Sequence, residues 1–84
     1  MPINVTRRDK FRSLRKKYGV SQRKVALALG VSESQIRFIE TGRVNPSVEL
    51  LFKMSLFFNT PPEELLPDLA EKAKRELETC QHVL

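Results

Sequence analysis

The stretch SQRKVALALGVSESQIRFIETG, residues 21–42, constrains the fold of this chain more than any other. Ser21 and Ser32 can each cap a helix, because a serine hydroxyl accepts a hydrogen bond from a free backbone N–H group of the first turn. Gly30, between them, permits the positive φ angle that a sharp turn requires. The stretch therefore predicts a short helix, a tight turn and a second helix that ends at Gly42.

The flanking sequence predicts further helices and no strand. Apolar residues recur at helical spacing, and prolines or glycines separate the segments. Thr6, Ser47 and Asp68 are placed to cap three of these helices. The helices are expected over residues 6–18, 22–29, 32–42, 48–58, 61–66 and 68–84. The predicted fold class is all-α with short connections.

Length and composition exclude several classes of protein. A chain of 84 residues can bury one modest core but leaves no room for an enzyme cleft between two layers. The single cysteine excludes an intramolecular disulfide and a multi-cysteine metal site, and no apolar run is long enough for a membrane span or a signal peptide. With one histidine and no paired-carboxylate site or phosphate loop, no nucleophile has a base. We expect a cytoplasmic protein that is not an enzyme and has no cofactor and no metal.

The net charge of +5 is distributed unevenly along the chain. Residues 1–24 hold nine lysines or arginines against one aspartate, whereas residues 61–84 hold three against six acidic residues. A basic front part suits a polyanion such as nucleic acid. The alternative is that these charges only keep a helix surface soluble.

The second helix of the central stretch carries side chains suited to base recognition. With Ile36 and Ile39 facing the core, its opposite face presents polar residues that could reach base edges in the major groove of DNA. Arg37 can pair with guanine O6 and N7, Glu33 can accept from a cytosine amine, and Phe38 could touch a thymine methyl or pack against the following helix. The candidate DNA contacts are Gln22, Arg23, Ser32, Glu33, Ser34, Arg37, Phe38, Arg43 and Asn45.

Residues 11–66 resemble the lambda-repressor-like helix-turn-helix domains of the Cro and phage-repressor family, the Xre family. The matching residues are Ser21-Gln22, Ala28, Gly30-Val31-Ser32, Ile36, Ile39-Glu40, Gly42 and Asn45-Pro46-Ser47.

The resemblance implies a five-helix domain that binds DNA and is usually dimeric. It implies that Gln22 grips a phosphate and that Arg43 contacts another. It also implies a buried structural ion pair between Arg15 and Glu40. Phe38 departs from the family pattern, because a polar or small side chain is frequent at its position.

We therefore expect a lambda-repressor-like DNA-binding domain over residues 1–66 and a C-terminal helix over residues 67–84. The apolar stripe of this last helix must be buried, either by folding back or by pairing with a second copy. Dimerisation is slightly favoured. The residues expected at the dimer interface are Leu66, Leu69, Ala73, Leu77 and Cys80.

The function predicted from these features is sequence-specific DNA binding by a transcriptional regulator. A homodimeric repressor on a palindromic operator, of bacterial, phage or mobile-element origin, fits the residues best. The alternative is a protein-interaction module or an antitoxin that acts mainly through a regulatory protein partner. Salt-dependent DNA binding distinguishes the two.

Overall fold

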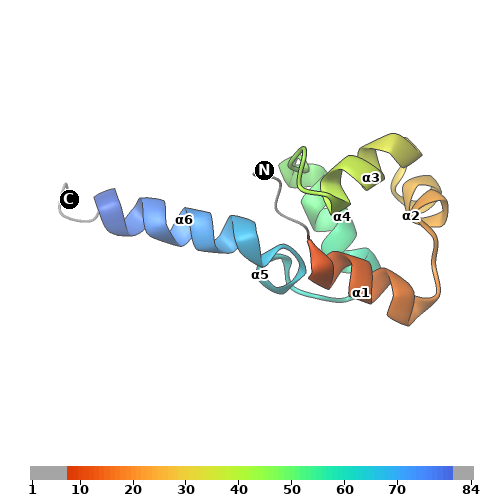
Figure 1. Cartoon of the computed structure of the whole chain (residues 1–84), viewed down its shortest axis with the longest axis horizontal. Helices are drawn as coiled ribbons and strands as arrows, with labels where there is room; N and C mark the ends of the chain where they lie inside the picture. Colours follow the sequence, from red (N-terminus) through yellow and green to blue (C-terminus); the bar gives the residue numbers. More distant parts are fainter. Residues whose placement is uncertain (1–7, 81–84) are drawn as a thin grey trace, which may run out of the picture.

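The structure is a computed structural model that describes residues 8–80 and, for Cys80, the backbone only. Helices make up most of this part of the chain, and residues 8–80 contain no strand (Figure 1). The helices are α1 (Asp9–Tyr18), α2 (Gln22–Leu29), α3 (Glu33–Glu40), α4 (Val48–Phe58), α5 (Pro62–Leu65) and α6 (Pro67–Cys80). The predicted all-α fold is confirmed.

Serine caps begin three of the helices, as the sequence predicts. The hydroxyl groups of Ser21, Ser32 and Ser47 each accept a hydrogen bond, at 3.0–3.1 Å, from the backbone N–H group three residues later. Gly30 ends α2 with a φ angle of 75°, in the left-handed region that favours glycine. The chain therefore turns sharply from α2 into α3.

The core joins α1 to α5 through one cluster of apolar side chains. Phe58 of α4 lies at its centre, edge-on to Phe11 of α1 with ring centroids 5.6 Å apart. Tyr18 also meets Phe58 edge-on and donates its hydroxyl hydrogen to the Phe58 carbonyl at 2.8 Å. The core residues are Phe11, Leu14, Val25, Ala26, Leu29, Ile36, Ile39, Leu50, Met54, Phe58, Leu65 and Leu66. This packing fixes α3 against the rest of the domain.

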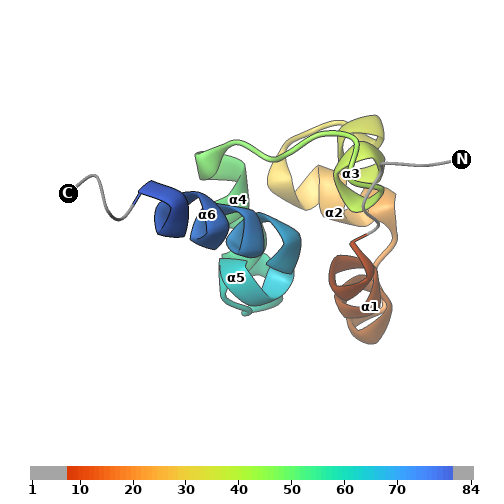
Figure 2. The same ribbon diagram turned by 60° about the vertical axis from the view of Figure 1, so that its left-hand side comes forward.

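The last helix leaves the bundle soon after it begins. Figures 1 and 2 both show α6 extending from α5, away from α1–α3. Leu69 and Ala70 in its first turn are half-buried, whereas every residue from 71 to 79 is exposed. Within the described residues, α6 therefore does not fold back on its own domain beyond its first turn.

Three sequence predictions about these elements need correction. Leu66, predicted at a dimer interface, is only 1% exposed and belongs to the core. Asp68 does not cap α6, which begins at Pro67, because its carboxylate is turned toward Arg8. The first helix begins at Asp9 without a side-chain cap, and Thr6 lies outside the described residues.

Candidate nucleic-acid interface

α3 divides into an apolar inner face and a polar outer face. Ile36 and Ile39 are fully buried. Glu33, Ser34 and Arg37 are all exposed. Helical periodicity places these polar residues together on the side of α3 away from the core. The outer face therefore offers a carboxylate, a hydroxyl and a guanidinium to a ligand.

Two arginines gather at the end of this face around Phe38. The guanidinium carbons of Arg37 and Arg43 lie 5.6 and 5.7 Å from the centroid of the half-buried Phe38 ring. Arg37 also donates a hydrogen bond from Nη2 to Ser34 Oγ at 3.2 Å. The structure thus brings together four of the residues predicted to contact DNA.

The turn after α3 holds Arg43 close to the helix. The backbone N–H groups of Arg43 and Val44 both donate to the Phe38 carbonyl, at 2.8 and 3.3 Å. The Thr41 hydroxyl donates to the Arg37 carbonyl at 3.1 Å. These bonds satisfy carbonyls that the end of a helix leaves free, and they fix the start of the loop.

Glu40, at the end of α3, is the centre of a buried ionic network. Arg15 of α1 donates from Nε to Oε1 at 2.9 Å and from Nη2 to Oε2 at 3.1 Å. Gln22 of α2 donates from Nε2 to Oε1 at 3.2 Å. The structure therefore brings the expected pair together and adds Gln22, so that one carboxylate joins α1, α2 and α3. An amide hydrogen of Gln22, predicted to grip a phosphate, is engaged by Glu40 here.

Arg8 is the residue that the sequence analysis missed. Its side chain is only 2% exposed and donates five hydrogen bonds. Their acceptors are the carbonyls of Ile39 and Val44, Asn45 Oδ1 and, twice, Asp68 Oδ2. Arg8 thus connects the end of α3 and its following loop to the start of α6.

This network changes the interpretation of Asn45. Its side-chain oxygen accepts from Arg8 Nη2 at 2.6 Å, so that oxygen stabilises the loop. Nothing in the local sequence marks this contact, because Arg8 lies 37 residues earlier in the chain. Of the other candidates, Arg23 is exposed on α2, and Ser32 caps α3.

The arrangement suits a large anionic ligand. Hydrogen-bond donors and two cations lie on a convex helix face and the adjoining loop, where base edges and phosphates could reach them. Among residues 8–80, no group of three or more histidine, cysteine or acidic side chains is placed to hold a metal ion. In the same range, no helix is long and apolar enough to cross a membrane.

Sequence comparison identifies relatives over the same region. A family model described as helix-turn-helix matches residues 11–65. An uncharacterised HTH-type transcriptional regulator of Archaeoglobus fulgidus is 40% identical over 58 residues, which cover 69% of this chain and 83% of that protein. Another from Methanocaldococcus jannaschii is 34% identical over 58 residues, covering 69% of this chain and 88% of that protein.

Solved structures share the arrangement of the helices. The restriction-modification controller protein C.AhdI from Aeromonas hydrophila superimposes with a TM-score of 0.62 at 30% identity, over 68% of this chain and 86% of that chain. The clp gene regulator ClgR from Corynebacterium glutamicum gives 0.63 at 28% identity, over 89% of this chain and 82% of that chain. A transcriptional regulator from Listeria innocua, 16% identical with a TM-score of 0.67 over 96% of this chain and 97% of that chain, is similar in fold alone.

Proposed function

We propose, since this chain belongs to the helix-turn-helix family of DNA-binding transcriptional regulators, that it binds a palindromic operator as a homodimer and represses transcription there. The observation that carries this proposal is the outer face of α3. Glu33, Ser34 and Arg37 are exposed on a helix whose opposite side is fully buried. That face would lie in the major groove, with Arg37 paired to a guanine.

Phosphate contacts would supply the affinity that does not depend on sequence. Arg43 follows α3 directly, and Lys10, Lys16 and Lys17 are exposed on α1. Each phosphate that such a cation neutralises steepens the dependence of log K on log salt by about 0.9. An operator occupied in this way is closed to other proteins, so repression is the simplest consequence of binding.

Fluorescence anisotropy with labelled duplexes tests DNA binding. One duplex is selected from a random pool, and a scrambled duplex of the same length is the control. We expect tighter binding to the selected duplex, and a steep fall in affinity for both duplexes between about 50 and about 300 mM salt. Equal affinity for both duplexes would contradict sequence-specific recognition. No binding to either, or no response to salt, would overturn the DNA proposal and favour a protein-interaction module or an antitoxin.

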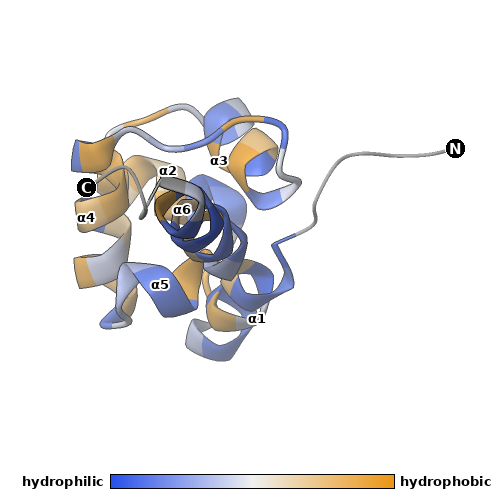
Figure 3. Cartoon of the chain, turned by 90° about the vertical axis from the view of Figure 1, so that its left-hand side faces the viewer, coloured by the Kyte–Doolittle hydropathy of each residue, from blue (hydrophilic) through white to orange (hydrophobic). Residues whose placement is uncertain are grey.

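The homodimer would use the exposed apolar face of α4. Val48, Phe52 and Leu56 are 73%, 60% and 81% exposed and follow one another at intervals of four residues, which places them on one stripe. In Figure 3, α4 is coloured mostly as apolar, whereas α6 is coloured mostly as hydrophilic. An exposed apolar stripe of this kind is typical of a protein interface.

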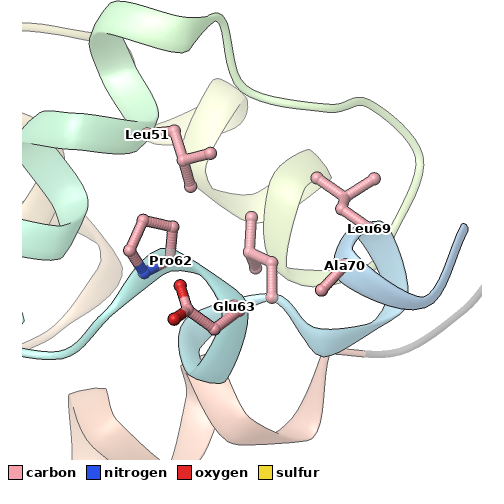
Figure 4. A pocket seen from close by; sticks show the side chains of 6 residues that line it. Leu51, Pro62, Glu63, Leu69 and Ala70 are labelled. Atoms are coloured by element: carbon pink, nitrogen blue, oxygen red, sulfur yellow. The ribbon is translucent and has the colours of Figure 1, made fainter. Parts of the chain in front are cut away.

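A second apolar surface adjoins α4, a groove that reaches α6. It has a volume of about 260 Å³ and lies between α4, α5 and the first turn of α6 (Figure 4). Its lining residues are Leu51, Pro62, Glu63, Leu66, Leu69 and Ala70. Ala73 and Leu77 lie further along α6 and are exposed. In this proposal α4 forms the centre of the interface and α6 its edge.

The charges beside the stripe favour a second copy of the chain as the occupant. Glu49 and Lys53 lie in one row next to the apolar residues, 3.7 Å apart within α4. In an antiparallel pair of α4 helices this row faces itself in reverse order, and each Glu49 would meet the Lys53 of the other copy where the two-fold axis passes beside residue 51. The row is therefore complementary to itself, as a symmetric interface requires.

Sedimentation of two variants tests the interface. Phe52→Glu places a charge on the α4 stripe without disturbing the core, since Phe52 is exposed, and should yield monomers. Leu77→Glu makes the same change on α6, where Leu77 is 70% exposed, and should weaken the dimer less. If only Leu77→Glu gives monomers, the interface lies on α6. If the unaltered protein is a monomer at every concentration, the homodimer proposal fails.

If DNA is the ligand, the location and the mode of action of the protein can be proposed as well. We place the protein in the cytoplasm, and we propose that it acts by binding and not by catalysis. The division between a DNA-binding domain over residues 1–66 and a C-terminal helix over residues 67–84 stays a prediction. Cys80, predicted at the dimer interface, has no described side chain.

A further inference from the structure

Phe38 occupies an unusual place on the recognition face. Its ring is half-buried at the end of α3, and both exposed arginines of this region approach it. The guanidinium carbons of Arg37 and Arg43 lie 5.6 and 5.7 Å from the ring centroid. Both distances are within the range in which the π-electrons of an aromatic ring attract a cation.

Two like charges lie near the Phe38 ring without an acidic partner in the described part of the chain. Among residues 8–80, no acidic side chain forms an ion pair with Arg37 or Arg43. The Phe38 ring offers both guanidiniums a favourable contact at the end of α3, and Arg37 adds a hydrogen bond to Ser34.

The backbone of Phe38 strengthens this arrangement. Its carbonyl accepts hydrogen bonds from the N–H groups of Arg43 and Val44 at 2.8 and 3.3 Å, and from the Thr41 hydroxyl at 3.3 Å. The start of the loop and the ring are thus fixed to the same residue. The backbone of Arg43 therefore stays beside Phe38 as long as the turn after α3 is closed.

We infer that Phe38 is a positioning residue that orders Arg37 and Arg43 for DNA before binding, and is not itself a base contact. The inference rests on the proposed function. An arginine side chain loses much rotamer freedom when it binds, and a side chain that is already ordered loses less. The aromatic ring thus raises affinity through its neighbours, so Phe38 need not touch the thymine methyl that the sequence suggested.

A pair of substitutions separates the aromatic ring from mere apolar bulk. Phe38→Leu removes the ring and keeps an apolar side chain, whereas Phe38→Tyr keeps the ring. We expect the affinity of Phe38→Leu for a duplex selected from a random pool to fall about tenfold, and that of Phe38→Tyr to stay within about twofold. Thermal unfolding followed by circular dichroism confirms that both variants fold. Equal affinities for the two variants would overturn the inference.

Double-mutant cycles identify the route by which Phe38 acts. Arg37→Ala and Arg43→Ala are each measured alone and combined with Phe38→Leu. If the ring acts through the arginines, the combined losses are smaller than the sum of the single losses. Additive losses with both arginines would show that Phe38 acts independently of them, and the inference would be wrong.

A measurement without DNA separates this inference from the proposed function. The Nε–Hε resonances of Arg37 and Arg43 should carry a ring-current shift that Phe38→Leu removes and Phe38→Tyr retains. If DNA binds but these resonances do not respond, this inference fails alone. If the shifts are present but the protein binds no duplex, the proposed function fails. The role of Phe38 in DNA binding then fails as well, although its contact with the arginines is real.

Discussion

Arg8 and Arg15 lie inside the domain among hydrogen-bond acceptors, whereas Arg37 and Arg43 lie on its surface beside an aromatic ring. Arg8 donates five hydrogen bonds, and Arg15 forms a two-point contact with Glu40. Neither Arg37 nor Arg43 pairs with a carboxylate within the part of the chain that the structure describes. The same side chain thus serves two purposes in one small protein.

The difference shows that the positive charge of the chain is not one electrostatic surface. Arg8 and Arg15 belong to the basic run of residues 1–24, yet both are held by acidic partners of the same chain. A buried guanidinium with these partners fixes the geometry of the loop and of α3. An exposed one remains available for a phosphate or a base.

The largest expected effect comes from removing the most enclosed arginine. Arg8→Met leaves two backbone carbonyls and the carboxylate of Asp68 without their donor. Because these largely buried carbonyls and the partly buried Asp68 carboxylate lose their donor, we expect the free energy of unfolding to fall by about 4 kcal/mol. Urea denaturation measures this loss.

A surface arginine supplies the control for Arg8. Arg23 is exposed on α2, so Arg23→Met should change the free energy of unfolding by no more than about 0.5 kcal/mol. Equal losses of unfolding free energy for the two variants would show that Arg8 stabilises the fold no more than an exposed arginine does. The comparison between buried and exposed arginines would then no longer hold.

A smaller loss of stability is expected at the pair between α1 and α3. Arg15→Met should lower the free energy of unfolding by about 3 kcal/mol, because it leaves the Glu40 carboxylate buried with a weaker set of partners. Replacing both residues, as Arg15→Met with Glu40→Leu, should recover part of this loss, since neither charge remains unpaired. A double variant that loses the full sum of the single losses would show that the two side chains stabilise the fold independently.

Local signals explain which parts of the fold were predictable. Ser21, Ser47 and Gly30 mark the bounds of α2 and the start of α4, because caps and left-handed turns depend on a few neighbouring residues. The outer face of α3 was also predictable, since burial of Ile36 and Ile39 fixes the opposite side of the helix.

Contacts between distant residues explain what the sequence did not reveal. Arg8 meets Asp68 across 60 positions of the chain, so no local pattern marks either as a partner of the other. Leu66 belongs to an apolar series that continues into α6, and periodicity alone cannot show that the core takes Leu66 while Leu77 stays exposed. The ring of Phe38 meets Arg43 only because the chain turns back after α3.

Among the surface arginines, Arg37 is expected to have the larger effect on DNA binding. Arg37→Ala should leave the free energy of unfolding within about 0.5 kcal/mol and weaken binding to the selected duplex by about 1–3 kcal/mol. Binding to scrambled DNA should change much less, because a base contact is lost. Anisotropy titration of both duplexes measures this, with Arg75→Ala on the exposed part of α6 as the control. Equal loss on the two duplexes would show that Arg37 does not recognise a base.

Arg43→Ala should have the smallest effect and a different signature. Because we propose that Arg43 neutralises a phosphate, its loss should weaken binding to the selected and scrambled duplexes about equally and lower the salt slope of log K by about 0.9. Titration at several salt concentrations gives that slope. If Arg43→Ala instead reduces the preference for the selected duplex, Arg43 acts in base recognition together with Arg37. The two arginines beside Phe38 would then form one recognition unit, and only the contrast with the buried arginines would remain.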